Sequence, residues 1–282
     1  MTIQSAMKQG YTILTSAEVE TPHLDSTVLL AHALKTTKEK LYASLPDRIS
    51  DADLAVFKAL IEKRCNGIPV SYIRNRKEFY GLEFYVDRRV LVTRPDTEIV
   101  VDTLLSILDE NPDFQEVHDL CTGSGCIAIS LKHLKPLLAV TASDISPEAG
   151  EVFKLNSSHI LHTELPFYCS DLFDKINGPF DIIVSNPPYL TDKEVDSMKR
   201  LAWPEPVLAL YGGKAGVAVT RRLIKQAPGH LHPGGFVVLE SAPAIMDELK
   251  KIMESSGFID IVIIKDLGGR NRVIAGRKPW VK

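Results

Sequence analysis

The stretch DLCTGSGCIAIS, residues 119–130, decides the fold of this chain. It follows the apolar segment 117–121 and continues with apolar residues at helical spacing, so we expect a strand that turns into a helix. Gly123 and Gly125 lack side chains where strand turns into helix, so a ligand can approach the backbone closely. Asp144 stands nineteen residues after Gly125, at the end of the next predicted strand. Its carboxylate can accept hydrogen bonds from both hydroxyls of a ribose, which predicts a nucleoside-bearing cofactor at the carboxyl ends of the strands.

These residues do not identify the cofactor. Gly123, Gly125 and Ala128 also satisfy the G-x-G-x-x-G/A pattern of dinucleotide-binding proteins, and an acid about 20 residues further on fits that pattern too. A tight strand-to-helix turn without any ligand is the simplest alternative. A further motif has to decide between these interpretations.

From about residue 95 onward, apolar strands alternate with helical stretches, which predicts an α/β fold with a mostly parallel sheet and helices on both faces. The predicted strands are 117–121, 138–145, 168–172, 181–185, 236–240, 259–265 and 272–277. The predicted helices are 97–108, 126–134, 147–157, 216–227 and 244–256. The short turn 266–271 leaves no room for a helical crossover, so the last two strands should form an antiparallel hairpin.

The region before residue 95 divides into two parts. Residues 1–70 are predicted to be helical, with Ser50 as the cap of a helix, Asp53 in the capping-box position and Gly67 as the stop. The charges of this region balance, which favours a partner-docking domain over a nucleic-acid-binding one. Residues 71–94 are predicted to form a β-hairpin linker around Gly81. This linker is rich in arginine, as expected either of a patch for a negatively charged partner or of a solvated face.

The composition limits the possible function classes. A chain of 282 residues corresponds to about two domains, and 45% hydrophobic residues suffice for a sizeable core. Its net charge of −3 argues against a general nucleic-acid coat or a polybasic membrane anchor. Apolar runs are far shorter than the ~18 residues that cross a bilayer, and no secretion signal is visible. The four cysteines form no CxxC pair, so we expect reduced thiols in a cytoplasmic protein without a zinc site.

The motif that decides the function is FDIIVSNPPYL, residues 180–190. An apolar strand ends here in two prolines, which fix the backbone and leave carbonyl acceptors exposed. The Asn186 side-chain oxygen and the Pro187 carbonyl can accept the two hydrogens of a planar NH2 group, and Tyr189 offers a flat face for stacking. Acceptors placed out of the substrate plane favour the pyramidal nitrogen of a transition state. The alternative is a rigid proline turn without a chemical role.

With these motifs, the sequence resembles the class I S-adenosylmethionine-dependent methyltransferases that act on nitrogen. Three further segments resemble the HemK/PrmC family, the release-factor-specific protein-(glutamine-N5) methyltransferases: KEFYGLEFYVDRRVLVTRPDTE (77–98), WPEPVLALYGG (203–213) and DLGGRNRVIAG (266–276). The resemblance implies a Rossmann-like seven-stranded catalytic domain over residues 95–282, preceded by the N-terminal helical domain and the hairpin linker.

The resemblance also implies the site. Cofactor contacts are expected from Cys121, Thr122, Gly123, Ser124, Gly125, Asp144, Leu172 and Asn186. Asn186, Pro187, Pro188 and Tyr189 are expected to hold the glutamine of the GGQ motif of a bacterial release factor, with Asn186, Pro187 and Tyr189 in the catalytic role. S-adenosylmethionine would be converted to S-adenosylhomocysteine. No metal, membrane contact or stable nucleic-acid binding is expected, and the protein is expected to be a monomer.

The chain departs from the family pattern at a few positions. Thr93 and Asp96 replace the usual proline and glutamate of PRPETE, and Leu172 stands where relatives often have an aromatic residue. Glu240 ends a predicted strand on the ligand edge, where a structural role and a place near the site are about equally expected. A nucleic-acid amino-methyltransferase and a non-catalytic cofactor-binding module are the rival hypotheses, and labelling of a release factor, DNA or RNA discriminates them.

Overall fold

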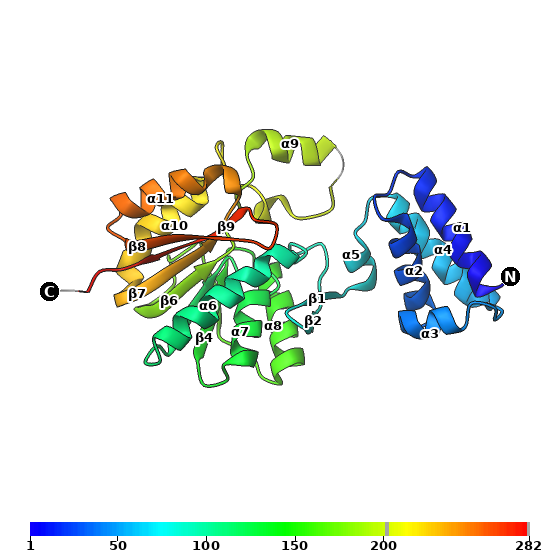
Figure 1. Ribbon diagram of the computed structural model, residues 1–282, viewed down its shortest axis with the longest axis horizontal. Helices are drawn as coiled ribbons and strands as arrows, with labels where there is room; N and C mark the ends of the chain where they lie inside the picture. The colour runs from blue at the N-terminus through cyan, green and yellow to red at the C-terminus, as the bar shows by residue number, and fades with distance from the viewer. Residues whose placement is uncertain (201–202, 281–282) are drawn as a thin grey trace. The chain divides into compact units, whose positions relative to one another are not determined.

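The computed structural model describes residues 1–200 and 203–280, which form two compact units (Figure 1). The first unit comprises residues 1–76 together with 203–204, and the second comprises residues 77–200 and 205–280. Within the described residues, no helix is both long and apolar enough to span a membrane.

The first unit is helical, as predicted. Its helices are α1 (Ile3–Ser16), α2 (Pro22–Ala33), α3 (Lys38–Ala43), α4 (Asp51–Cys65) and α5 (Val70–Arg74). The predicted cap of α4 is confirmed: the Ser50 hydroxyl accepts a hydrogen bond from the Asp53 backbone N–H at 3.1 Å and donates to the Asp53 carboxylate at 2.7 Å. Leu14, Leu30 and Phe57 are buried in a core that these helices form by themselves.

The hairpin is shorter than predicted. β1 (Lys77–Phe79) pairs antiparallel with β2 (Leu82–Phe84) around Gly81, which has a φ of +72°. Before β1, residues 71–74 belong to α5, whose C-cap Asn75 has the left-handed conformation, and residues 85–94 after β2 are neither helix nor strand. The buried rings of Phe79 and Phe84 meet edge to face, with centroids 6.1 Å apart.

The second unit is built on a seven-stranded sheet, counted over its described residues, with the order β5-β4-β3-β6-β7-β9-β8. The strands are β3 (Glu116–Leu120), β4 (Ala139–Asp144), β5 (Phe167–Cys169), β6 (Phe180–Ser185), β7 (Leu231–Glu240), β8 (Ile259–Lys265) and β9 (Asn271–Arg277). The strands from β5 to β7 pair in parallel, whereas β9 pairs antiparallel with both β7 and β8. The predicted sheet and its final hairpin are therefore confirmed.

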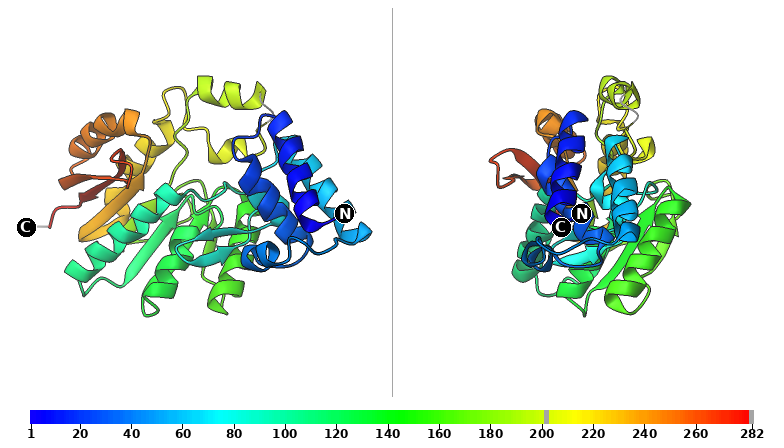
Figure 2. Two further views of the ribbon diagram at one scale, coloured as in Figure 1. Left: turned by 45° about the vertical axis from the view of Figure 1, so that its right-hand side comes forward. Right: turned by 90° about the vertical axis from the view of Figure 1, so that its right-hand side faces the viewer.

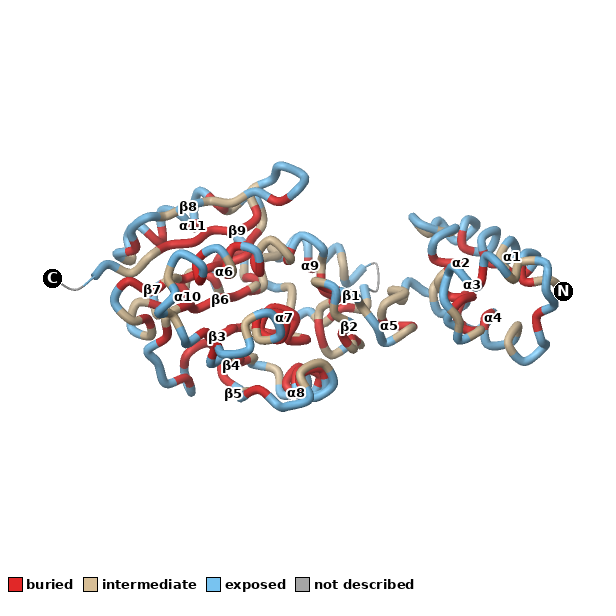
Figure 3. Tube along the Cα trace, turned by 60° about the horizontal axis from the view of Figure 1, so that its bottom comes forward, coloured by how far each residue is buried: buried red, intermediate tan, exposed pale blue. Residues whose placement is uncertain are grey.

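Helices cover both faces of this sheet (Figure 2). One face carries α6 (Glu98–Glu110), α7 (Cys126–Leu134) and α8 (Pro147–Leu161), and the other carries α10 (Ala218–Gln226) and α11 (Met246–Ser255). The short helix α9 (Asp192–Arg200) follows β6 outside these two layers. The central strands are buried (Figure 3), since side chains such as Ile183, Val237 and Leu239 pack against α10 and α11.

The topology places the predicted motifs together. β4, β3 and β6 are neighbours and run parallel, so their carboxyl ends lie at one edge of the sheet. At this edge, the glycine-rich turn follows β3, Asp144 is the last residue of β4, and the Asn-Pro-Pro-Tyr segment follows β6.

Candidate active site

The glycine-rich turn leaves the end of β3 in left-handed backbone conformations. Cys121 has a φ of 57° and Gly123 a φ of 56°, and a side chain at Gly123 would extend into open space. At Gly125, packing leaves no space for a side chain: an added Cβ would lie 2.6 Å from the Phe153 ring and 2.7 Å from Ile129. Gly123 therefore leaves room for a ligand, whereas at Gly125, where φ is +83°, the packing against Phe153 and Ile129 and the left-handed backbone each require a glycine in addition to any ligand.

Asp144 is fixed at the end of β4 by two backbone donors. The Gly123 N–H donates to Oδ2 and the Ser146 N–H donates to Oδ1, each at 2.9 Å. Burial raises the pKa of Asp144, and the N–H groups of Ser146 and Gly123 oppose this rise because they stabilise the carboxylate. The turn after β3 and the end of β4 thus hold one carboxylate in a defined position.

A second carboxylate lies beneath the same turn. Asp119 is buried, and its Oδ2 accepts hydrogen bonds from the Thr122 hydroxyl at 2.6 Å and from the Ala128 N–H at 3.3 Å. Its other oxygen is buried without a partner, and burial raises the pKa of Asp119 to about 7. The sequence analysis did not select Asp119 as a site residue, although an acid at a strand end just before two glycines was a usable signal.

The Asn-Pro-Pro-Tyr segment is locked by the loop that follows α9. The Leu190 N–H donates to the Leu210 carbonyl at 2.8 Å, and the Gly212 N–H donates back to the Leu190 carbonyl at 2.9 Å. A Cβ on Gly212 would lie only 2.6 Å from the Pro188 carbonyl oxygen and 2.7 Å from the Tyr189 Cα. The proline turn therefore rests directly on a glycine backbone that leaves no space for a side chain.

One cavity of about 330 Å³ joins these features, a volume suited to a small-molecule ligand. The predicted site residues that line it are Cys121, Thr122, Gly123, Ser124, Asp144, Leu172, Asn186 and Pro188. Gly125, Pro187 and Tyr189 do not line it. Leu172 lies beyond the end of β5, with a φ of 48°, rather than inside the predicted strand.

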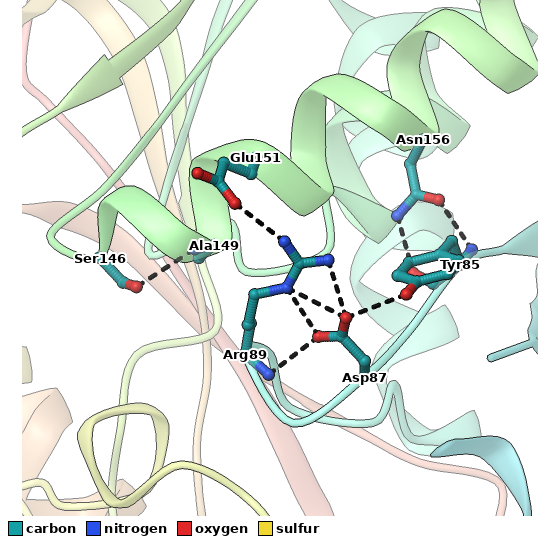
Figure 4. Close-up of polar contacts among 7 residues, drawn as sticks. All are labelled: Tyr85, Asp87, Arg89, Ser146, Ala149, Glu151 and Asn156. Carbon is teal, nitrogen blue, oxygen red and sulfur yellow. Dashed lines mark hydrogen bonds and ion pairs between the residues drawn. The ribbon is translucent and has the colours of Figure 1, made fainter. Parts of the chain in front are cut away.

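The sequence analysis did not identify the role of the segment after the hairpin. Arg89 lines the cavity and is held by Asp87 through several hydrogen bonds, while its Nη1 donates to Glu151 on α8 at 2.9 Å (Figure 4). The buried Asn156 side chain accepts from the Tyr85 N–H at 2.7 Å and donates to the Ser124 carbonyl at 2.8 Å. Arg89 of the predicted basic patch is therefore part of the cavity wall.

Further along, residues 92–94 are tied to a buried glutamate. Glu205 accepts a hydrogen bond from the Val92 N–H at 2.9 Å and from Arg94 Nη2 at 2.6 Å. Its side chain is fully buried, so the pair with Arg94 offsets the cost of burying the charge. Thr93, one of the departures from the family pattern, lines the cavity with a buried hydroxyl that has no partner.

Glu240 lies at the end of β7, next to β6, and is buried. Burial raises the pKa of Glu240 to about 7, while the guanidinium of Arg272 favours the charged form. Burial and the Glu240 carboxylate together raise the pKa of Tyr189 to about 12, so this phenol is neutral at physiological pH. Glu240 does not line the cavity, but its charge acts on Tyr189 of the Asn-Pro-Pro-Tyr segment.

Nothing in the described ranges, 1–200 and 203–280, offers three or more His, Cys, Asp or Glu side chains grouped around a metal position. The four cysteines are free thiols, and Cys169 is exposed.

The fold and the site define a class I methyltransferase. A solved methyltransferase from Pyrococcus furiosus shares this fold, with a TM-score of 0.53 and 21% identity over 72% of this chain and 92% of that one. The model of the PrmC N-terminal domain matches residues 5–74, and that of the methyltransferase small domain matches residues 96–202. A release factor glutamine methyltransferase of Koribacter versatilis is 37% identical over 99% of both chains, and one of Clostridium acetobutylicum is 34% identical over 97% of this chain and 98% of its own length. The chain belongs to the release factor glutamine methyltransferase family, which confirms the resemblance found in the sequence.

Proposed function

We propose that this chain transfers a methyl group from S-adenosylmethionine to the side-chain amide nitrogen of the glutamine in the GGQ motif of bacterial peptide chain release factors. The observation that carries this proposal is that a single cavity is lined both by Gly123 and Asp144 and by Asn186. The first two residues suit a nucleoside, and the third suits an amide. The names of the full-length relatives support the choice of substrate.

The residues present fit the cofactor. The open space at Gly123 lets a ligand reach the backbone, and the fixed Asp144 carboxylate can accept hydrogen bonds from ribose hydroxyls. Leu172 and Ile145 line the same cavity and offer apolar contact to an adenine ring. When bound, S-adenosylmethionine supplies a methyl group on a sulfonium, which is a strong electrophile.

The chain's own contribution is to hold and activate the amide. An amide nitrogen is a poor nucleophile because its lone pair is delocalised. We propose that the Asn186 side-chain oxygen accepts one of its hydrogens and that the carbonyl of Pro187, which stands between the cavity-lining residues Asn186 and Pro188, accepts the other. Two such acceptors favour the pyramidal nitrogen of the transition state. Tyr189 is half-buried and follows these acceptors in the chain, and its neutral ring offers a flat surface for stacking. As the new N–C bond would form, the S–CH3 bond would break and S-adenosylhomocysteine would leave as a neutral thioether. The cationic nitrogen then loses one proton to water, so no general base is required.

The deciding experiment is methyl transfer with radiolabelled cofactor to a purified release factor, its GGQ→GGA variant, DNA and RNA. We expect label in the wild-type release factor alone. Label in the GGA variant or in a nucleic acid would overturn the assignment of the acceptor.

We also propose that the enzyme acts in the cytoplasm, where its substrate works in translation termination, and that it acts as a monomer.

A further inference from the structure

An exposed apolar segment forms part of the cavity rim. It comprises residues 206–211, Pro-Val-Leu-Ala-Leu-Tyr, and is called the apolar ridge below. Leu208 is 55% exposed, and Val207 and Tyr211 are each 41% exposed. Leu208 and Tyr211 also line the cavity, together with Pro206 and Ala209. Apolar side chains clustered in water beside a polar site are typical of a binding surface.

The apolar ridge is a fixed structure. Its centre is a 3-10 helix, Val207–Ala209, closed by hydrogen bonds from the Leu210 and Tyr211 N–H groups to the Val207 carbonyl at 3.0 and 2.9 Å. One end continues into Glu205, which binds residues 92–94, and the other pairs with Leu190. Little conformational entropy is therefore lost when a partner covers it.

The attachments of the apolar ridge place it on the substrate side of the cavity. Leu190 follows directly after the Asn-Pro-Pro-Tyr segment, which comes after β6, whereas Asp144 ends β4, and β3 lies between these two strands. The described hydrogen bonds of the ridge backbone reach residue 190 and not the glycine-rich turn. The ridge therefore lies beside the amide acceptors rather than beside the ribose carboxylate.

The reach of a glutamine side chain then identifies the occupant. Four bonds of about 1.5 Å join the Cα to the amide nitrogen, so an extended side chain spans only about 5 Å. A glutamine bound at Asn186 must bring its own main chain to the rim of the cavity. The apolar ridge carries no charge, and glycines next to the glutamine would let their backbone lie close against apolar side chains.

We infer that the apolar ridge binds the main chain of the release-factor loop on either side of the target glutamine, and that Leu208 is its principal contact. This inference rests on the proposed function and adds a specificity surface to it. The ridge makes the enzyme select an uncharged, glycine-rich loop in addition to the glutamine side chain.

The test measures kcat and KM for a purified release factor in Leu208→Ser, together with the cofactor affinity by calorimetry. We expect KM to rise about tenfold, as for the loss of one buried apolar side chain, with kcat and cofactor affinity near wild type. Leu137→Ser is the matched control, because Leu137 is 92% exposed and does not line the cavity. This control should leave all three quantities unchanged.

Leu208→Asp and Leu208→Lys separate apolar contact from charge attraction. Both substitutions should raise KM for the release factor if the contact is apolar. If one of them raised KM and the other lowered it, the contact would depend on charge, and the inference would be overturned. An unchanged KM in Leu208→Ser would overturn it too, as would weaker cofactor binding that accounts for the whole loss. A wild-type enzyme that does not methylate release factor at all would instead contradict the proposed function.

Discussion

At the scale of single residues, the Asp144 carboxylate is held in one position in the cavity wall. Both of its oxygens already accept one backbone hydrogen bond, so its position does not depend on a ligand. We expect Asp144→Ala to weaken S-adenosylmethionine binding by about 1.5–3 kcal/mol, the usual contribution of hydrogen bonds to a charged group. Calorimetry measures the affinity, and Asp174→Ala, an exposed carboxylate outside the cavity lining, is the control. Unchanged affinity in a folded Asp144 variant would remove this residue from the cofactor site.

The proposed chemistry depends most on Asn186. It lines the cavity and is half-buried directly after β6. Asn186→Ala removes one preorganised acceptor while leaving both prolines, so we expect single-turnover methyl transfer to fall by about 10²–10³. Asn186→Asp keeps an acceptor but adds a negative charge, so kcat should fall more than cofactor affinity. Near-wild-type turnover in Asn186→Ala would mean that the segment is only a rigid turn.

At the scale of elements, Gly212 positions the proline turn. A Cβ there would meet backbone atoms of Pro188, Tyr189 and Gly216 at 2.6–2.7 Å, and none of these can move without displacing the turn. We expect Gly212→Ala to lower kcat at least about tenfold and to destabilise the fold by about 1–3 kcal/mol, as overpacking does. Steady-state kinetics and thermal unfolding measure the two effects.

Gly229→Ala is the matched control for this substitution, because a Cβ at Gly229 has no atom within 4 Å. Its kcat and unfolding temperature should remain near those of the wild type. If Gly212→Ala behaved like this control, the turn would tolerate displacement, and its rigidity would not contribute to catalysis.

β3 carries a buried titratable group that makes stability depend on pH. His118 lies between the Thr141 and Ser143 hydroxyls of β4, at 2.7 and 2.9 Å. Burial lowers the pKa of His118 to about 3, so the native state keeps it neutral while the unfolded chain binds a proton below about 6.5. The stability that neutral His118 confers is therefore complete above pH 6.5 and is lost as the pH falls towards 3.

Unfolding by denaturant between pH 7 and pH 4 measures this effect. One proton corresponds to a slope of about 1.4 kcal/mol per pH unit, and we expect His118→Gln to lose that contribution relative to the wild type. The buried Asp119 and Glu240 are present in both proteins, so their opposite contributions cancel in the comparison. The exposed His159→Gln should follow the wild-type curve. If the free energy of unfolding of His118→Gln changed with pH as that of the wild type does, His118 would not be held neutral in the native state.

Local patterns in the sequence predicted most of the helices and strands. They failed where contacts between distant residues determine the conformation of a segment or the role of a residue. Apolar strands and periodic helices gave the sheet to within a few residues, since burial on both faces leaves a clear pattern. The hairpin was predicted too long, because apolar residues continue on both sides of it, through Tyr72 and Ile73 of α5 and through Val90 and Val92 after β2, where no strand forms. The packing of Gly125 against Phe153 could not be predicted, because Phe153 lies on another helix, 28 positions further along the sequence.

At the scale of the whole molecule, the cavity combines segments that lie far apart in the sequence. Motifs predicted its glycine-rich turn, Asp144 and Asn186, because each has a local signature. Arg94 binds Glu205, which lies 111 positions further along the sequence, and Arg89 binds Glu151, which lies 62 positions further. No local sequence pattern connects residues that are so far apart. The wall formed by residues 89–97 and the apolar ridge was therefore not predictable from the sequence alone, although both lie within segments that carry the family resemblance.

The helical unit gives the last prediction. Residues 1–76 have their own core around Leu30 and Phe57, and no residue before Arg89 lines the cavity of the second unit. A protein that begins at Lys77 should therefore bind S-adenosylmethionine as the full chain does. If the helical unit docks the release factor, kcat/KM for intact release factor should fall at least about tenfold in this truncated protein. A short peptide containing GGQ cannot reach a distant docking surface, so its methylation should change less than about twofold. Equal losses for the peptide and the intact factor, with cofactor affinity retained, would show that this unit supports catalysis rather than docking.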